Sequence, residues 1–178
     1  MKNNPIKKII CVLCAALALL IPACGGQNEY KLNEKNFFLV MTNMWYYPAQ
    51  YVGCDIECDV FTYRITDLNG KEYLCGVRKC SAGYGCTCGA DTVIGFILSY
   101  DGEIPEPRNQ SEDTGDKSWI HIKGKLKSDR FTDIEINSYD ASGNVVDGVT
   151  ETVKMLEFEV EELTEITDWS GLNYYVTK

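Results

Sequence analysis

The pentapeptide TDLNG at residues 66–70 separates two segments with the composition of β-strands. Asn69-Gly70 is the short-range signal most typical of a tight β-hairpin turn. We therefore predict a hairpin formed by residues 54–65 and 71–79. The rest of the fold is inferred outward from this hairpin.

Strand patterns continue along the chain after the hairpin. Further strands are predicted over residues 91–99, 119–126, 131–137, 145–150 and 153–163, and the tail 166–177 is predicted to add an edge strand. The polar segment 101–117 is predicted to be a long loop, a kind of loop that is often functional or mobile. Before the hairpin, apolar residues at helical spacing predict a short helix over 34–45 with Asn33 as its N-cap.

The order of these elements indicates a fold class. Several short strands, one short N-terminal helix and no alternation of strands with helices predict a mainly β protein. The strand number suits a small OB-like β-barrel, which closes its sheet and so limits exposed edges. A β-sandwich is the alternative.

The N-terminus has the pattern of a secretory signal peptide. Residues 9–21 form an apolar run of 13 residues that carries no charge, and three lysines precede it: Lys2, Lys7 and Lys8. A membrane span needs roughly 20 apolar residues, so this run is short for one. We predict a signal peptide over residues 1–23.

Cys24 follows this run in the sequence Ile21-Pro22-Ala23-Cys24, which resembles a bacterial lipobox. The cysteine of a lipobox carries diacylglycerol and becomes the new N-terminus, and two acyl chains are enough for stable anchoring. The expected mature chain is extracytoplasmic and lipid-anchored to the bacterial cell membrane, with a tether over 24–35 and an OB-like domain over 36–178. The alternative is an ordinary signal peptide cleaved after Ala23, with Cys24 a free thiol.

Charge and cysteine content limit the classes of function. The full chain has 17 basic and 26 acidic residues, and removing the signal peptide with its three lysines leaves a formal charge of −12. Such a charge repels phosphate backbones, so nucleic-acid binding is disfavoured. Three of the nine cysteines lie at or before Cys24, which leaves six in the domain. Export permits disulfides among them, and the sequence does not choose the pairing.

The densest chemical feature is the group Cys80, Cys86 and Cys88. Thiolates are soft ligands that suit Zn²⁺ or Cu(I), so this group is a candidate metal site. A tetrahedral zinc site needs a fourth ligand, for which the candidates are Cys75, Asp91 and His121.

Two alternatives to metal binding remain open for these cysteines. They form structural disulfides or stay buried in the core, where free cysteine is common. Otherwise Cys86 and Cys88 form a reducible pair in a thiol–disulfide oxidoreductase. Nothing else in the sequence indicates catalysis, and His121 is interpreted as a solvated histidine at a strand rim.

Three segments together resemble a known family. They are YPAQYVG at residues 47–53, CTCGADTVIGF at residues 86–96 and WIHIKG at residues 119–124. Their order is similar to the C-terminal OB-like domain of bacterial envelope "domain of unknown function" proteins that accompany predicted permeases. The resemblance covers roughly residues 44–165 and implies an OB-like fold and an envelope location, with no assigned reaction.

The sequence therefore predicts a lipid-anchored, non-enzymatic binding module or permease accessory. Its expected partners are the membrane, a permease and a small-molecule or metal ligand. The oxidoreductase that uses Cys86 and Cys88 is the alternative, and binding of an oligosaccharide or peptide on the barrel face rests on fold analogy.

Overall fold

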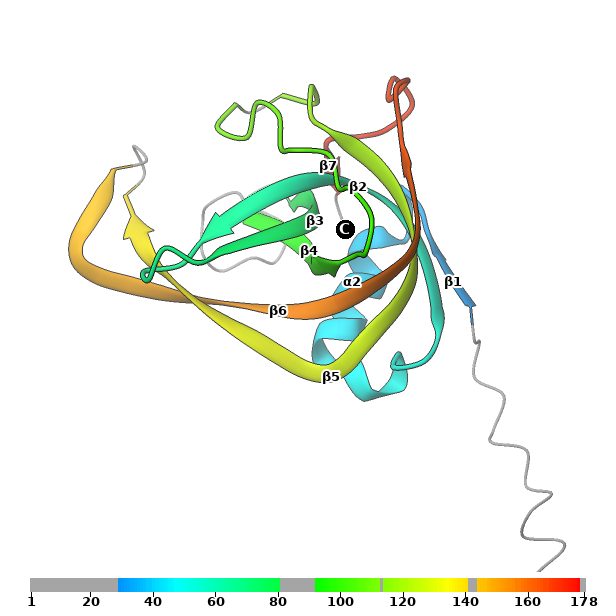
Figure 1. Cartoon of the computed structure of the whole chain (residues 1–178), viewed down its shortest axis with the longest axis horizontal. Helices are drawn as coiled ribbons and strands as arrows, with labels where there is room; N and C mark the ends of the chain where they lie inside the picture. The colour runs from blue at the N-terminus through cyan, green and yellow to red at the C-terminus, as the bar shows by residue number, and fades with distance from the viewer. Residues whose placement is uncertain (1–28, 81–91, 113, 141–143, 177–178) are drawn as a thin grey trace, which may run out of the picture.

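A computed structural model describes residues 29–80, 92–112, 114–140 and 144–176 of the chain. Figure 1 shows one long, strongly curved sheet with a single α-helix packed at one end. Its elements, in chain order, are β1 (Glu29–Leu32), α2 (Phe37–Tyr46), the 3-10 helix η1 (Pro48–Gln50), β2 (Asp55–Thr66), β3 (Glu72–Cys80), β4 (Thr92–Ser99), β5 (Trp119–Tyr139), β6 (Val145–Glu165) and β7 (Tyr175–Val176).

Five of the strands close into a ring. Strand β2 pairs antiparallel with both β3 and β5, and the ring continues from β3 through β4 and β6 back to β5. The β4–β6 pairing is parallel, and the others within the ring are antiparallel. This Greek-key ring confirms the prediction of a mainly β, OB-like fold. It is not a regular barrel, because β5 and β6 extend well beyond it.

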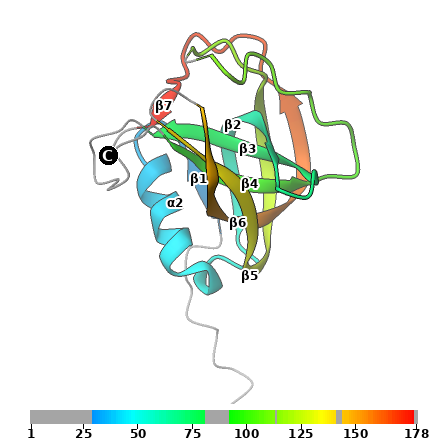
Figure 2. The same cartoon turned by 90° about the vertical axis from the view of Figure 1, so that its left-hand side faces the viewer.

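The inside of the ring forms the first core. Alternate residues of β2 point inward (Ile56, Cys58 and Val60), as the period of a strand requires. Helix α2 closes one end of the ring and buries Phe37, Met41 and Met44 against this core, as Figure 2 shows from the side. The helical spacing of these three residues is therefore a packing stripe.

A glycine permits the tight curvature of the ring. At Gly124, where β5 crosses β6, an added Cβ would lie 2.0 Å from the carbonyl oxygen of Glu159. The register between the two strands also shifts at Lys123/Gly124. The strands approach too closely here for any side chain, so glycine is required.

The distal halves of β5 and β6 form an arm, which we define as residues 131–139 and 145–155. A register shift between Leu126 and Phe131 bends β5 where the arm begins. The arm then folds across the outer face of β2, β3 and β4, and the backbone N–H of Leu68 donates to the carbonyl of Glu135 at 2.9 Å.

A second core lies between this outer face and the arm. Three alternate residues of β2 point outward into this core: Phe61, Tyr63 and Ile65. They lie on the opposite face of the sheet from the β2 residues of the first core. The arm contributes Ile134 and Met155, both buried. The outer face of the β2–β3 hairpin is thus covered by chain that comes more than 50 residues later in the sequence.

Several predicted boundaries were wrong. The separate strands predicted over 119–126 and 131–137 are one bent strand, β5, and the pair predicted over 145–150 and 153–163 is one strand, β6. The tail 166–177 contributes only the two residues of β7. The first of these differences has a physical cause, because a bulge such as the one between Leu126 and Phe131 bends a strand without ending its ladder and leaves little signal in the sequence.

The N-terminal segment also differs from the prediction. Residues 29–32, expected within a tether, form β1, which runs parallel to β2 and buries Leu32 in the first core. The N-cap of the helix is Asn36, not Asn33. Asn33 instead forms the turn before the helix, where its side-chain oxygen accepts a hydrogen bond from the N–H of Lys35 at 2.9 Å.

The predicted signal peptide and Cys24 lie outside the described residues. Among the residues that are described, none belongs to a helix with the length and apolar character needed to cross a membrane.

Candidate functional site

A cavity of the described structure lies between the outer face of the β2–β3–β4 sheet and the arm. Its volume is about 530 Å³, within the range of small-molecule sites. We call it the tyrosine cavity. Its floor is apolar, and tyrosines supply most of its aromatic rings. The floor consists of Phe61, Ile65, Val93, Ile136 and Val153, and the tyrosines are Tyr63, Tyr139 and Tyr174.

The tyrosines come from three different parts of the chain. Tyr63 projects from β2, Tyr139 ends the β5 side of the arm, and Tyr174 lies in the C-terminal segment just before β7. Burial raises the pKa of Tyr63, and a hydrogen bond with Gln110 partly opposes that rise. The hydroxyl of Tyr63 therefore stays protonated at neutral pH and is able to donate a hydrogen bond.

Two of the charged groups that line the cavity have partners among their neighbours. The Arg64 guanidinium forms ion pairs with Glu72 and Glu106. The Glu151 carboxylate accepts a hydrogen bond from the Ser138 hydroxyl at 2.6 Å. The surface offered to a ligand therefore combines apolar groups, hydroxyls and an amide with the charged side chains of Lys79 and Glu151.

The long loop between β4 and β5 is pinned beside this cavity. The Gln110 side chain accepts a hydrogen bond from the N–H of Arg64 and donates one to its carbonyl, each at 2.8 Å. Lys117 is buried, and its ammonium donates to the carbonyls of Asn109 and Glu112. The loop predicted over 101–117 is present, and it is fastened at both of these places.

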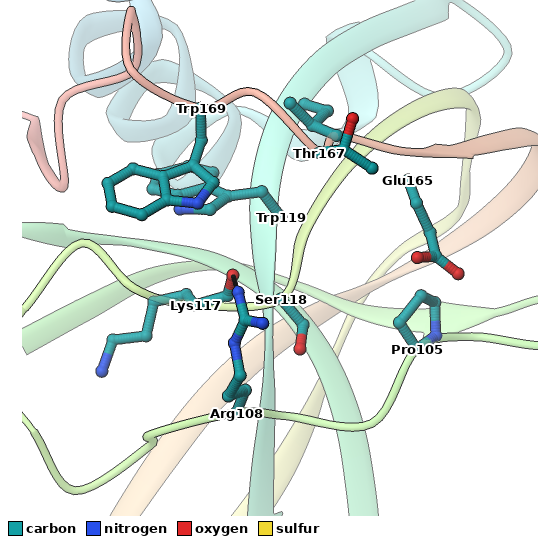
Figure 3. A pocket seen from close by; sticks show the side chains of 9 residues that line it. Pro105, Arg108, Lys117, Ser118, Trp119, Glu165, Thr167 and Trp169 are labelled. Atoms are coloured by element: carbon teal, nitrogen blue, oxygen red, sulfur yellow. Dashed lines mark hydrogen bonds between the residues drawn. The ribbon is translucent and has the colours of Figure 1, made fainter.

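A smaller cavity of about 330 Å³ lies beneath the same loop. Figure 3 shows Arg108, Trp119 and Trp169 on one side of it and Glu165 on the other. Arg108 forms an ion pair with Asp116 at 2.9 Å and donates to the carbonyl of Lys117. Its polar groups mainly hold the loop in place, so we interpret this cavity as a structural feature of the loop and not as a ligand site.

A wall of stacked rings separates the two cavities. Tyr174 stacks on Phe61 with centroids 5.5 Å apart, and Phe61 meets Trp119 edge-on at 5.3 Å. The Lys117 ammonium lies 5.3 Å from the centre of the Tyr174 ring. Residues of the smaller cavity therefore pack against one wall of the tyrosine cavity and stabilise it.

The predicted cysteine site lies only partly within the described residues. Cys86, Cys88 and Asp91 fall outside them. Cys80 is buried at the end of β3, where it pairs with Thr92 at the start of β4. Within the described part of the chain, no three His, Cys, Asp or Glu side chains are placed to hold a metal ion.

The described cysteines have the character of core residues. Cys54, Cys58, Cys75 and Cys80 are all free thiols. Burial raises the pKa of Cys80 to about 11 and that of Cys75 to about 12, and it raises the pKa of Cys58 further still. These three thiols are therefore protonated at neutral pH and weak as nucleophiles.

The described residues on either side of the cysteine-bearing segment 81–91 lie close to the tyrosine cavity. Lys79 on β3 pairs with Val93 on β4, and both residues line the cavity. Cys80 and Thr92 are the next residue pair along the same two strands. The end of β3 and the start of β4 therefore lie at the cavity rim.

His121 lies at the surface, as expected for a rim histidine. Its side chain is 40 % exposed, with Nδ1 2.7 Å from Oδ1 of Asp59 and Nε2 3.6 Å from Oε1 of Glu57. These two carboxylates belong to β2, whereas His121 belongs to β5. The three side chains form a cross-strand polar cluster on the sheet surface.

The sequence did not single out the tyrosine cavity. Tyr63 is one of 11 tyrosines, and no spacing connects it with Tyr139 or Tyr174. These residues come together only because the arm folds back over the β2–β3 hairpin.

The structure defines a mainly β, OB-like module that carries a covered cavity on its outer face. The chain belongs to the family described as the DUF1980 C-terminal domain, whose model matches residues 18–140. This agrees at the level of the family with the resemblance carried by the three sequence segments.

One curated relative is UPF0703 protein YcgQ from Bacillus subtilis (strain 168). It is 26 % identical to this chain over 110 residues, which cover 60 % of the chain and 33 % of that protein. The chain thus matches about a third of the length of this relative. No solved structure matches the chain.

Proposed function

We propose that this chain is a lipid-anchored, extracytoplasmic, non-enzymatic module that binds a ligand in the tyrosine cavity. The observation that carries this proposal is the cavity itself, with its apolar floor, its three tyrosines and a few polar side chains at its rim. A concave, mainly apolar site with a few well-placed polar groups is the usual form of a small-molecule site.

The chemistry of the cavity favours a neutral oligosaccharide as the ligand. Tyrosine rings offer flat apolar surface together with a hydroxyl, which suits a ligand with apolar faces and hydrogen-bonding edges. OB-folds use this outer face and its flanking hairpin loops to bind oligonucleotides or oligosaccharides. The charge of −12 expected for the mature chain opposes a polyphosphate ligand, which leaves the oligosaccharide class.

Titration calorimetry with a chitotetraose probe tests this function. Val153 lies in the cavity floor, so Val153→Phe fills the site, and we expect that variant to lose binding. Val149 lies on the same strand and is 47 % exposed, so Val149→Phe is a matched control that should bind as the wild type does. Equal binding by both variants, or none by the wild-type chain, would contradict the proposal.

The lipid anchor rests on the lipobox pattern before Cys24. Mass spectrometry of the mature chain should find diacylglycerol on Cys24, and Cys24→Ser should release the protein from membranes. An unmodified N-terminus at Cys24 would favour the alternative of ordinary signal cleavage. A permease partner, expected from the family resemblance, would copurify only with the anchored form.

The cysteine group is proposed as a soft-metal site at the cavity rim, formed by Cys80, Cys86 and Cys88 with Zn²⁺ or Cu(I). The position of the described residues Cys80 and Thr92, next to the cavity-lining pair Lys79 and Val93, supports this placement. Stoichiometric metal that is lost in a Cys86→Ser/Cys88→Ser variant is the expected result. If the chain carries no metal and that variant loses exchange with a model disulfide, the oxidoreductase alternative is favoured.

A further inference from the structure

An exposed aromatic surface lies at one end of the molecule, away from both cavities. It consists of four residues at the end of α2 and around η1, which we call the aromatic end: Trp45 (47 % exposed), Tyr46 (65 %), Tyr47 (56 %) and Val52 (43 %). The rings contact one another, with centroids 5.3 Å apart for Trp45 and Tyr46 and 6.4 Å for Tyr46 and Tyr47. They form one continuous surface, which single exposed apolar residues do not.

The aromatic end is held rigidly on the barrel. Trp45 packs against Phe131 at the bend of β5, with centroids 5.6 Å apart. Val52 forms a β-bridge with Leu126, just before the same bend. The exposed Arg130 lies within that bend, so a basic group accompanies the rings.

The chain enters the fold at this same end. Glu29, the first residue of β1, pairs with Asp55 at the start of β2. Tyr30 packs on Tyr51 with ring centroids 4.8 Å apart, and Tyr51 lies four residues after Tyr47. Figures 1 and 2 both place the start of β1 and the end of α2 at the lower end of the molecule.

The distance to the anchor is therefore short. Only residues 25–28 lie between Cys24 and β1. The five peptide steps from Cys24 to Glu29 span at most about 17 Å when fully extended. A lipid on Cys24 would hold the aromatic end next to the headgroups.

We infer that the aromatic end is a membrane-contacting surface that lies in the lipid headgroup region and sets the orientation of the anchored domain. The inference rests on the proposed lipid anchor. Trp and Tyr prefer the membrane–water interface, because their rings are apolar and their N–H or O–H groups remain hydrated. The loop between β4 and β5 lies at the upper end in Figure 1, so it would face away from the bilayer.

Tryptophan quenching in vesicles tests this contact. The full lipidated chain is reconstituted into phosphatidylethanolamine/phosphatidylglycerol vesicles with acyl chains brominated near the headgroup. We expect quenching of Trp45 fluorescence that is lost in Trp45→Phe, since the other two tryptophans, Trp119 and Trp169, line the smaller cavity under the loop between β4 and β5. The variant Tyr46→Ser/Tyr47→Ser should also weaken this quenching.

A matched control and a flotation assay separate the possible outcomes. Val145→Ser/Val149→Ser removes two exposed apolar side chains from the arm and should leave quenching unchanged. Flotation of the wild-type chain without quenching of Trp45 overturns the inference and leaves the anchor intact. A wild-type chain that fails to float overturns the anchor itself. Concentration-dependent dimerisation of Cys24→Ser, abolished by Tyr46→Ser/Tyr47→Ser, would assign the surface to a second copy instead.

Discussion

At the scale of single residues, Arg78 is the charge whose environment matters most for stability. Its side chain is 1 % exposed, and its Nη2 lies 2.7 and 2.8 Å from the two carboxylate oxygens of Glu34. The guanidinium also lies over the rings of Phe37 and Trp119. One ion pair therefore ties β3 to the turn that precedes α2.

Glu34→Gln should lower the free energy of unfolding by about 3 kcal/mol, because it leaves the buried guanidinium without its counter-charge. Urea unfolding monitored by tryptophan fluorescence measures this loss. The control is Glu161→Gln, which breaks an exposed pair with Lys125 and should cost much less, because Lys125 is solvated and also pairs with Asp55. Equal losses for the two variants would show that burial of the pair contributes nothing.

The buried thiols give the protein a stability that depends on pH. Burial raises the pKa of Cys75 to about 12 in the folded state, whereas the thiol of an unfolded chain titrates near its ordinary value of 9.0. Above pH 9 the unfolded chain loses this proton first, so the stabilisation is complete at lower pH and falls as the pH rises toward 12.

Between pH 8 and pH 10.5, the free energy of unfolding should fall by about 2 kcal/mol less in Cys75→Ala than in the wild type, because the variant lacks the pKa difference at this thiol. Urea unfolding of both proteins at the two pH values gives the slopes. Cys54→Ala is the control, since Cys54 is a partly exposed free thiol. An unchanged slope in Cys75→Ala would contradict the assignment of a buried, protonated thiol.

At the scale of elements, the features that depend on local sequence were predicted correctly, whereas those that depend on contacts distant in sequence were not. The β2–β3 hairpin was recoverable because Gly70 takes a positive φ of 78° and the Asp67 carboxylate accepts hydrogen bonds from Asn69 and Lys71, all within five residues. The arm was not, because its fold-back depends on a bulge after Leu126 and on packing against residues far away in sequence.

Gly70→Ala should lower the free energy of unfolding by about 1 kcal/mol, because a Cβ is disfavoured at a left-handed backbone position. An added Cβ meets no other atom at Gly70, so the cost comes from the backbone alone. Gly171→Ala is the matched control, because its Cβ would also lie in open space and its φ is not positive. Thermal unfolding of the two variants compares them, and a stable Gly70→Ala would contradict the role of this turn.

At the scale of the whole molecule, the structure changes the expected relation between anchor and domain. The sequence predicted a tether over residues 24–35, but β1 begins at Glu29 and leaves only residues 25–28 as linker. Polar composition hid this strand, because Leu32 alone is buried there. The cavity was missed for the same reason as the arm, since it joins residues from elements that are far apart in the sequence.

The short linker makes membrane contact sensitive to its length. Inserting 20 Gly/Ser residues between Gln27 and Asn28 lengthens the linker from four residues to 24, which lowers the effective concentration of the aromatic end at the bilayer by about 15-fold under −3/2-power scaling. Quenching of Trp45 by brominated lipids should fall accordingly, while flotation stays complete. The same insert appended after Lys178 should change neither. Unchanged quenching with the longer linker would show that the aromatic end holds the membrane without help from the tether.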